Sequence, residues 1–247
     1  MKIALIQMGS KKGKISQNIV TMRRFLNESA LLGADIVAFP EMNITGYFAK
    51  PEYLDCCLNT DDPGIKKAVN LTLGSNITLI FGIAEKNGNK YHITQVIAES
   101  GNIVGVYRKH NIINDEAKIF KPGNSSPIFE KNGYKYGITI CADIDLPNLY
   151  QDYANKGCDF VIECASPDLY GNKNPRNWEK GYIWWRDNCI AKIGKYAKNY
   201  KIPIMVTTQS GRNVEDDFPG GGYLFSKNGD IISETIDYKQ EILIIDI

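Results

Sequence analysis

The stretch of sequence from Gly137 to Pro147 constrains this chain most, because it predicts a buried strand that turns directly into a helix. The run 138–140 is entirely β-branched, as is typical of a strand packed within a sheet. Asp145 is a suitable N-cap residue, and Pro147 is tolerated in a first helical turn, where its missing N–H group would have no partner. The sequence therefore predicts that Cys141 lies at a strand-to-helix turn.

A cysteine at such a turn has two interpretations. Its side chain would lie at the edge of the sheet, where the first N–H groups of the helix are free and the positive helix end lowers the pKa of the thiol. These properties suit a nucleophile, because the same N–H groups can bind an oxyanion. The alternative is a small buried hydrophobic residue, which describes most free cysteines, and residues 137–147 alone favour this alternative.

Hydrophobic patterning along the rest of the chain predicts one α/β domain over residues 1–247, with helices outside a mixed sheet layer. The predicted strands lie at 3–8, 35–39, 78–85, 91–99, 103–107, 128–130, 134–140, 159–164, 204–208, 223–225, 231–233 and 242–247. The predicted helices lie at 16–32, 65–73, 145–156 and 178–200. No linker of biased composition divides the chain.

Three residues that can carry chemistry, Glu41, Lys109 and Cys141, each follow a predicted strand. They fit nucleophilic catalysis on an acyl carbon, where a base must take the proton of a thiol whose unperturbed pKa is about 8.5. A carboxylate such as Glu41 in a desolvated pocket suits this task, and Lys109 would stabilise the oxyanion beside the N–H group of Ala142. The alternatives are a loop carboxylate that binds backbone N–H groups and a structural ion pair.

The composition limits the possible functions. A net charge of +1 at pH 7 gives no case for nucleic acid or an anionic membrane as partner. The apolar run 1–8 is too short for a signal peptide and no run is long enough to span a membrane, so we expect a cytoplasmic protein. The six cysteines form no CxxC pair and there are only two histidines, so we expect no disulfide and no metal site. The shortage of histidine favours a base other than imidazole.

These motifs resemble those of the carbon–nitrogen hydrolase (nitrilase) superfamily, which has a Glu-Lys-Cys triad in this chain order. The matching segments are 34–41, 45–47, 107–109 and 137–143, with support from Glu116 and Phe120, from 122–123 and 165–167, and from the hairpin near Gly222 and the acidic ending 246–247. The resemblance extends over the whole chain, and no extra domain is expected. It implies an α-β-β-α sandwich, no metal or organic cofactor, and subunits that often pair into a larger assembly.

The resemblance also implies roles for single residues. Cys141 would carry a thioester intermediate, Glu41 would act as general base and acid, and Lys109 would bind the tetrahedral intermediate. Residues that would bind the substrate or support the triad are Tyr47, Glu116, Ala142 and Ser166. Glu116 resembles the family's second glutamate, which positions the lysine or the substrate.

The predicted function is a cofactor-free hydrolase that releases ammonia or an amine from a small linear amide or N-carbamoyl compound. A nitrilase proper uses the same triad on a C≡N group, so the triad does not separate the two. The Ala-Ser-Pro loop, Pro203 and the glycine-rich hairpin look closer to the glutaminase domains of glutamine-dependent NAD synthetases, although no synthetase domain follows here. We expect a homodimer or a larger homo-oligomer.

Some residues depart from the family pattern and leave other functions open. His110 follows Lys109 directly, and Asn148 stands where many members have Glu. A catalytically idle binding protein of the same fold and a redox-sensing Cys141 are the alternatives from other classes. Candidates for anchoring a substrate carboxylate are Arg176, Lys180 and Arg186, each of which also fits a solvated helix face.

Overall fold

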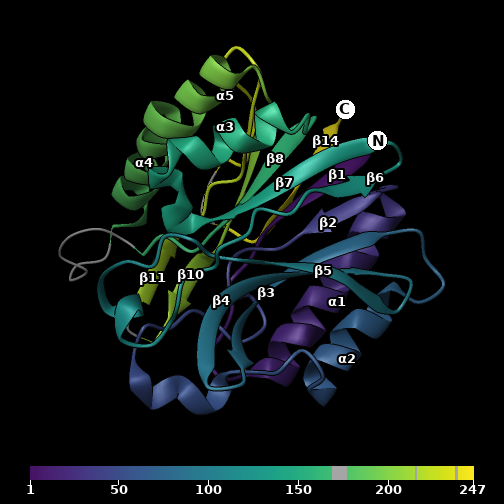
Figure 1. The fold of residues 1–247 in the computed structure, drawn as a ribbon, viewed down its shortest axis with the longest axis vertical. Coiled ribbons are helices and arrows are strands. Elements are labelled where there is room, and N and C mark those ends of the chain that lie inside the picture. The colour runs from purple at the N-terminus through teal and green to yellow at the C-terminus, as the bar shows by residue number, and fades with distance from the viewer. Residues whose placement is uncertain (169–176, 215, 237–238) are drawn as a thin grey trace.

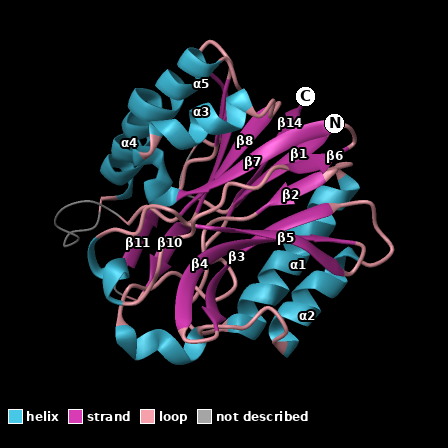
Figure 2. Cartoon of the chain, in the orientation of Figure 1, coloured by secondary structure: helices cyan, strands magenta, loops and turns pink. Residues whose placement is uncertain are grey.

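The computed structural model describes residues 1–168, 177–214, 216–236 and 239–247. Twelve of the described strands form two six-stranded sheets, two more form a hairpin, and helices lie on the outer side of each six-stranded sheet (Figures 1 and 2). The predicted α-β-β-α sandwich is therefore confirmed.

The first sheet has the strand order β14-β1-β2-β3-β4-β5. Strands β1, β2 and β3 run parallel, and β14, β4 and β5 join them in antiparallel pairs. The bounds are β1 Lys2–Gln7, β2 Ile36–Ala38, β3 Thr78–Asn87, β4 Lys90–Glu99, β5 Asn102–Arg108 and β14 Glu241–Asp246. Strands β3, β4 and β5 form the antiparallel meander that ends just before Lys109.

The second sheet has the strand order β13-β12-β9-β8-β7-β6. Its centre, β7, β8 and β9, is parallel, and β6, β12 and β13 are antiparallel to their neighbours. The bounds are β6 Phe129–Lys131, β7 Tyr134–Ile140, β8 Phe160–Ala165, β9 Ile204–Thr208, β12 Tyr223–Phe225 and β13 Ile231–Glu234. Parallel strands end at the same edge of a sheet, so the segments after β7, β8 and β9 begin side by side.

The helices divide between the two outer layers (Figure 1). Helices α1 and α2 lie beside the first sheet, and α3, α4 and α5 lie beside the second. The bounds are α1 Ile15–Leu31, α2 Pro63–Val69, α3 Pro147–Asn155, α4 Trp178–Cys189 and α5 Lys195–Tyr200. None of the described helices is long and apolar enough to cross a membrane.

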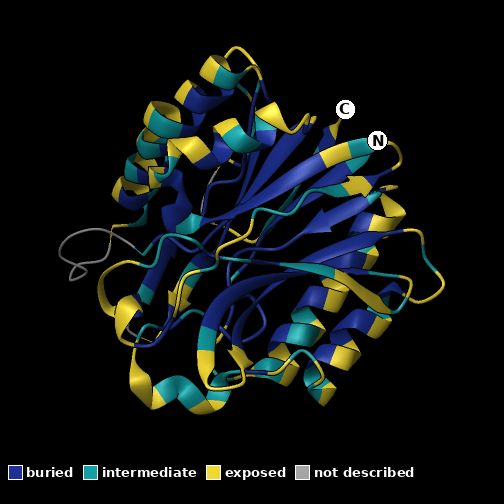
Figure 3. Cartoon of the chain, in the orientation of Figure 1, coloured by how far each residue is buried: buried dark blue, intermediate teal, exposed yellow. Residues whose placement is uncertain are grey.

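Side chains that alternate along the strands belong to two separate cores. Figure 3 shows that the strands are largely buried. In β1, Ile3 and Leu5 belong to a core that contains residues of both sheets and of α3, α4 and α5, whereas Ala4 and Ile6 belong to the core that contains residues of α1 and α2. Successive side chains of a strand point to opposite faces, so a strand covered on both sides is apolar throughout. This explains the continuous apolar runs in the sequence.

The structure differs from the prediction at one helix and at one hairpin. The helix expected over 178–200 is divided by a π-helical turn, Ile190–Gly194, between α4 and α5. The hairpin of β10 Ser210–Asn213 and β11 Asp216–Pro219 was not predicted, because its Gly, Asn and Asp residues are depleted in strands. The loop predicted after β8 and Arg176 lie partly or wholly outside the described residues.

Strand β3 packs closely against the loop after β2 at Gly82, and a substitution there tests this contact. A Cβ atom at Gly82 would lie 2.3 Å from the main-chain N of Met42 and 2.8 Å from the main-chain O of Pro40. Because backbone atoms have little room to move, we expect Gly82→Ala to lower the free energy of unfolding in urea by about 3 kcal/mol. The control is Gly88→Ala, where nothing lies within 4 Å of the added atom and only the positive φ of 59° is unfavourable. Equal losses in both variants would contradict the tight contact.

Candidate active site

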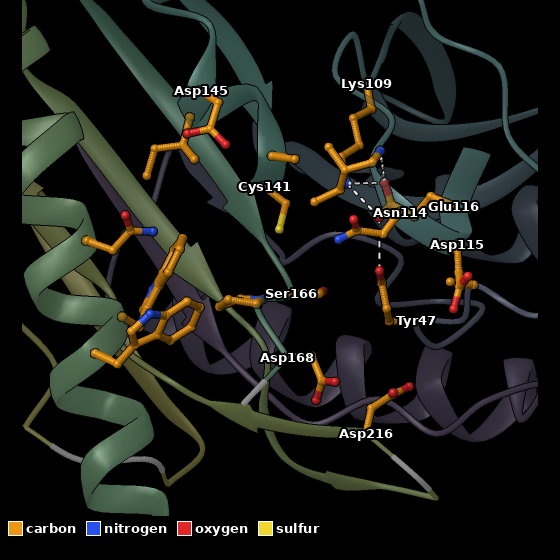
Figure 4. A pocket seen from close by; sticks show the side chains of 18 of the residues that line it. Tyr47, Lys109, Asn114, Asp115, Glu116, Cys141, Asp145, Ser166, Asp168 and Asp216 are labelled. Carbon is orange, nitrogen blue, oxygen red and sulfur yellow. Dashed lines mark hydrogen bonds and ion pairs between the residues drawn. The ribbon is translucent and has the colours of Figure 1, made fainter. Parts of the chain in front are cut away.

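A cavity of about 580 Å³ lies where the predicted site residues follow their strands (Figure 4). Its walls come from the segments after β5, β7 and β8, from the loop after β2 and from α4. The predicted residues in the lining are Tyr47, Lys109, Glu116, Cys141, Ala142 and Ser166. Glu41 is fully buried next to this lining, in contact with Lys109.

Lys109 is the centre of a buried group of charges. Its Nζ atom donates hydrogen bonds to Glu41 Oε1 at 2.9 Å and to the two carboxylate oxygens of Glu116 at 2.8 and 3.0 Å. The hydroxyl group of Tyr47 donates a 3.0 Å hydrogen bond to Glu116 Oε1 (Figure 4). The structure thus brings together all four of these predicted residues, which come from segments far apart in the sequence.

The charges of this group shift each other's pKa values. Burial raises the pKa of Glu41 to about 7, against the opposing effect of the Lys109 ammonium group. Burial alone would lower the pKa of Lys109, but the carboxylates of Glu41 and Glu116 raise it well above its usual range. At neutral pH the lysine is therefore charged, whereas Glu41 is close to the midpoint of its titration.

Cys141 has a left-handed backbone conformation, with φ of 47°. A residue with a side chain is strained in this region, and such strain persists only where the surroundings enforce it. Cys141 begins a 3₁₀ turn, Cys141–Asp145, that separates β7 from α3. Asp145 ends this turn and pairs with Lys192 at 2.5 Å, so the predicted N-cap role of Asp145 is wrong and Leu146 occupies the cap position.

The pKa of Cys141 also differs from the prediction. Because the α-helix begins only at Pro147, its positive end is not adjacent to the sulfur atom. Burial, together with the nearby carboxylate of Glu41, raises the pKa of the Cys141 thiol well above its usual value. The thiol is therefore protonated at neutral pH, and the predicted lowering of its pKa is wrong.

Asp143 connects the turn after β7 to the end of β5, and sequence reasoning missed it. Its carboxylate accepts hydrogen bonds from the Tyr107 hydroxyl at 2.6 Å and from the main-chain N–H groups of His110, Asn111 and Ile140 at 3.0, 2.7 and 2.9 Å. Asp143 is completely buried. One carboxylate thus satisfies polar groups from both segments that carry site residues.

A family model described as carbon–nitrogen hydrolase matches residues 2–247. The chain belongs to the carbon–nitrogen hydrolase family. It is 27% identical over 249 residues to a glutamine-dependent NAD(+) synthetase of Acinetobacter baylyi, covering 98% of this chain and 43% of that protein. It therefore spans less than half the length of that relative.

Two further matches are named as amidases. The chain is 29% identical over 191 residues to the human omega-amidase NIT2, covering 72% of this chain and 67% of that protein. An amidase of Nesterenkonia, described as a member of the nitrilase superfamily, matches with a TM-score of 0.85 at 17% identity, covering 100% of this chain and 90% of that structure. This likeness supports the sandwich fold.

In this carbon–nitrogen hydrolase, one wall of the cavity comes from α4 and the turn after it. Trp184, Trp185, Asn188 and Lys192 line the cavity there. Of the predicted carboxylate anchors, Arg186 forms an ion pair with Glu234 at 2.7 Å and does not line the cavity, and neither does Lys180. Among the described residues, no three His, Cys, Asp or Glu side chains form a group that would hold a metal ion.

The hydrogen bonds to Asp143 predict a large effect of a small substitution. In Asp143→Asn an NH₂ group would face N–H and O–H donors, so we expect the free energy of unfolding to fall by about 3 kcal/mol. Asp145→Asn is the matched control, because the Asp145 side chain is half exposed and its ion pair is worth about 1 kcal/mol or less. Urea denaturation of both variants measures the difference. A loss in Asp143→Asn no larger than in the control would contradict the connecting role of Asp143.

Proposed function

We propose that this carbon–nitrogen hydrolase cleaves the C–N bond of a small linear amide or N-carbamoyl compound through a thioester on Cys141. The observation that carries the proposal is the buried pairing of Glu41 and Lys109 beside a protonated thiol at the cavity wall. A thiol with a raised pKa needs a base, and a carboxylate with a pKa of about 7 is suited to take and return a proton near neutral pH.

The assignment of the base follows from the charges. Lys109 remains protonated because two carboxylates raise its pKa, so it has no free electron pair to accept the thiol proton. Glu116 already accepts hydrogen bonds from Lys109 and Tyr47. Glu41 is the remaining carboxylate of this group: its Oε2 atom has no hydrogen-bond partner among the described residues, and the neighbouring Cys141 thiol lowers its pKa.

In the acylation step, Glu41 takes the proton of the Cys141 thiol as the sulfur attacks the carbonyl carbon. A C–S bond forms, and the π electrons of the carbonyl group move to its oxygen. The Lys109 ammonium group and the main-chain N–H of Ala142, in the first turn of the 3₁₀ segment, bind this oxyanion. The C–N bond then breaks, and Glu41 gives its proton to the departing nitrogen, which leaves as ammonia or an amine.

Deacylation repeats the step with water. Glu41 takes a proton from water, the resulting hydroxide attacks the thioester carbon, and the same donors bind the second oxyanion. The C–S bond breaks, and the Cys141 sulfur recovers its proton from Glu41, while a carboxylic or carbamic acid leaves. Glu116 and Tyr47 are not consumed; they keep Lys109 charged and oriented.

The relatives support an amide as substrate. One is named an omega-amidase, and another is a synthetase that depends on glutamine, whose side chain ends in an amide. The cavity of about 580 Å³ is of a size that suits a small molecule. A panel of glutamine and other linear amides, N-carbamoyl amino acids and nitriles therefore covers the proposed class and its alternative.

Mass spectrometry of the intact protein tests the proposal. With a true substrate, protein quenched in acid during turnover should gain the mass of the acyl group on Cys141, because the thioester is covalent. Cys141→Ala should show neither this addition nor product. Cys158→Ala is the matched control, since Cys158 is buried and does not line the cavity, and it should retain both. An active Cys141→Ala variant would refute the proposal, and addition only with nitriles would reassign the substrate class.

Lys109→Ala should reduce the rate and move its pH dependence. Loss of an oxyanion donor raises the barrier by roughly 2.7–4 kcal/mol. Burial raises the pKa of Glu41 to about 7 against the effect of the Lys109 charge, so removing that charge raises this pKa further. The base acts in its ionised form, so the acidic limb of the rate profile should move to higher pH.

Single-turnover rates from about pH 5 to about pH 9 measure this shift. Lys131→Ala is the matched control, because Lys131 is also buried near a carboxylate, Glu99 at 3.8 Å, but does not line the cavity. It should leave both rate and limb unchanged. A slower Lys109→Ala variant with an unmoved limb would show that Lys109 does not tune Glu41.

A further inference from the structure

The main-chain carbonyl group of Glu41 is held from the opposite sheet. Its oxygen accepts a 2.9 Å hydrogen bond from the Ser166 hydroxyl and a 2.8 Å hydrogen bond from Gln209 Nε2. Ser166 directly follows β8 and Gln209 directly follows β9, whereas Glu41 follows β2 of the first sheet. All three residues are buried. Two donors from the second sheet thus converge on one peptide group of the first.

This peptide group is one that needs support. The next residue, Met42, has a positive φ of 50° and is fully buried. A methionine in this left-handed conformation is strained, and it persists only when surrounding contacts enforce it. The orientation of the Glu41–Met42 peptide also sets the direction in which the Glu41 side chain leaves the backbone.

The Gln209 side chain is committed to the Glu41 carbonyl group. Its main-chain groups are already paired, the N–H with Ala165 O and the C=O with Gly220 N, both at 3.0 Å. Its side-chain Oε1 is buried and has no hydrogen-bond partner among the described residues. A buried acceptor without a partner lowers the free energy of unfolding. An apolar side chain would therefore be more stable at this position if the Nε2 donor served no purpose.

The nucleophile belongs to the same sheet as these donors. Cys141 directly follows β7, which is the parallel neighbour of β8, and β9 is the next strand. The main chain of Ser166 also lowers the pKa of the Cys141 thiol, against the larger raising effect of burial. Ser166 thus bonds the main chain of Glu41 and lines the cavity together with Cys141, and Figure 4 shows it near Cys141.

We propose that Ser166 and Gln209 are positioning residues that hold the Glu41 main chain to the sheet of the nucleophile. The inference rests on the proposed function, in which Glu41 transfers the proton of Cys141. The two sheets meet at a bridge between Met8 and Gln209, where Ser210 N–H donates to Met8 O at 3.0 Å, so the distance from base to thiol depends on contacts between the sheets. The paired donors are such a contact, placed at the residue that carries the base. Their loss misplaces the carboxylate, and a displacement of about 1 Å can reduce a rate by about 10²-fold.

Alkylation of Cys141 by iodoacetamide tests this without knowledge of the substrate. The variants are Ser166→Ala, Gln209→Met and the double variant, followed by mass spectrometry from about pH 5 to about pH 9. Either remaining donor still holds the carbonyl oxygen, so each single variant should lose about tenfold or less in rate. The double variant should lose about 10²-fold, more than the product of the two single losses.

The pH profile separates positioning from a general loss of structure. The titrating or charged groups that interact with Glu41 all remain in the variants: Tyr47, Lys109, Glu116, Cys141, Glu163 and Cys164. Burial is the main cause of the raised pKa of Glu41, so a carboxylate released into the cavity should titrate lower and move the acidic limb to lower pH. The matched control is Thr207→Val, which removes a 2.6 Å hydrogen bond from β9 to the main-chain O of Ile6, also between the sheets.

Each outcome has a defined meaning. The inference is overturned if the double variant has the same alkylation rate, and the same position of the acidic limb of the pH profile, as Thr207→Val. If the double variant does not fold by urea denaturation, Gln209→Met alone decides by the same comparison with Thr207→Val. Glu41→Gln separates the two proposals, because it should remove the acidic limb. If Glu41→Gln keeps the acidic limb of the pH profile, the proposed function is rejected, and the inference with it. If Glu41→Gln loses the acidic limb but the double variant does not shift it, the inference alone is rejected.

Discussion

The buried contact of one lysine with two carboxylates is the interaction on which the site depends. Moving charged groups out of water costs several kcal/mol each, and their mutual attraction offsets this only with good geometry. Lys109 meets the requirement, because its ammonium group contacts Glu41 and Glu116 at 2.8–3.0 Å with no exposure to solvent. Hydrophobic residues in these places would pack at lower cost, so the charges are better explained by chemistry than by stability.

The fold supplies the contacts that keep such a group in place. Glu41 lies in the loop after β2, whereas Lys109 and Glu116 lie in the segment after β5, and buried polar side chains join these segments to the ends of other strands. Asp143 joins the end of β5 to the turn after β7 through four hydrogen bonds. Ser166 and Gln209 join the ends of β8 and β9 to the loop after β2. The strained backbone at Met42 and Cys141 is tolerated between these anchors.

The sequence predicted the fold and the group of residues at the cavity because both leave local signals. Apolar runs identify strands covered on both sides, and residues such as Glu41 or Lys109 directly after them identify the edge where sites form. The left-handed turn at Cys141 and the acceptor role of Asp143 leave no such signal, since they depend on contacts between segments. The predicted pKa of the thiol was wrong for the same reason: a local helix end was inferred, whereas burial decides the value.

The raised pKa of Cys141 bears on the alternative of a redox sensor. Sensor cysteines are exposed and have a low pKa, because oxidants attack the thiolate. Burial and the Glu41 carboxylate both disfavour a thiolate at Cys141, which therefore lacks this property at rest. In the proposed reaction the thiolate forms only as Glu41 accepts the proton, and Lys109 then offsets the negative charge that passes to the substrate oxygen. The same desolvation that leaves the free thiol unreactive thus makes Glu41 basic enough to activate it.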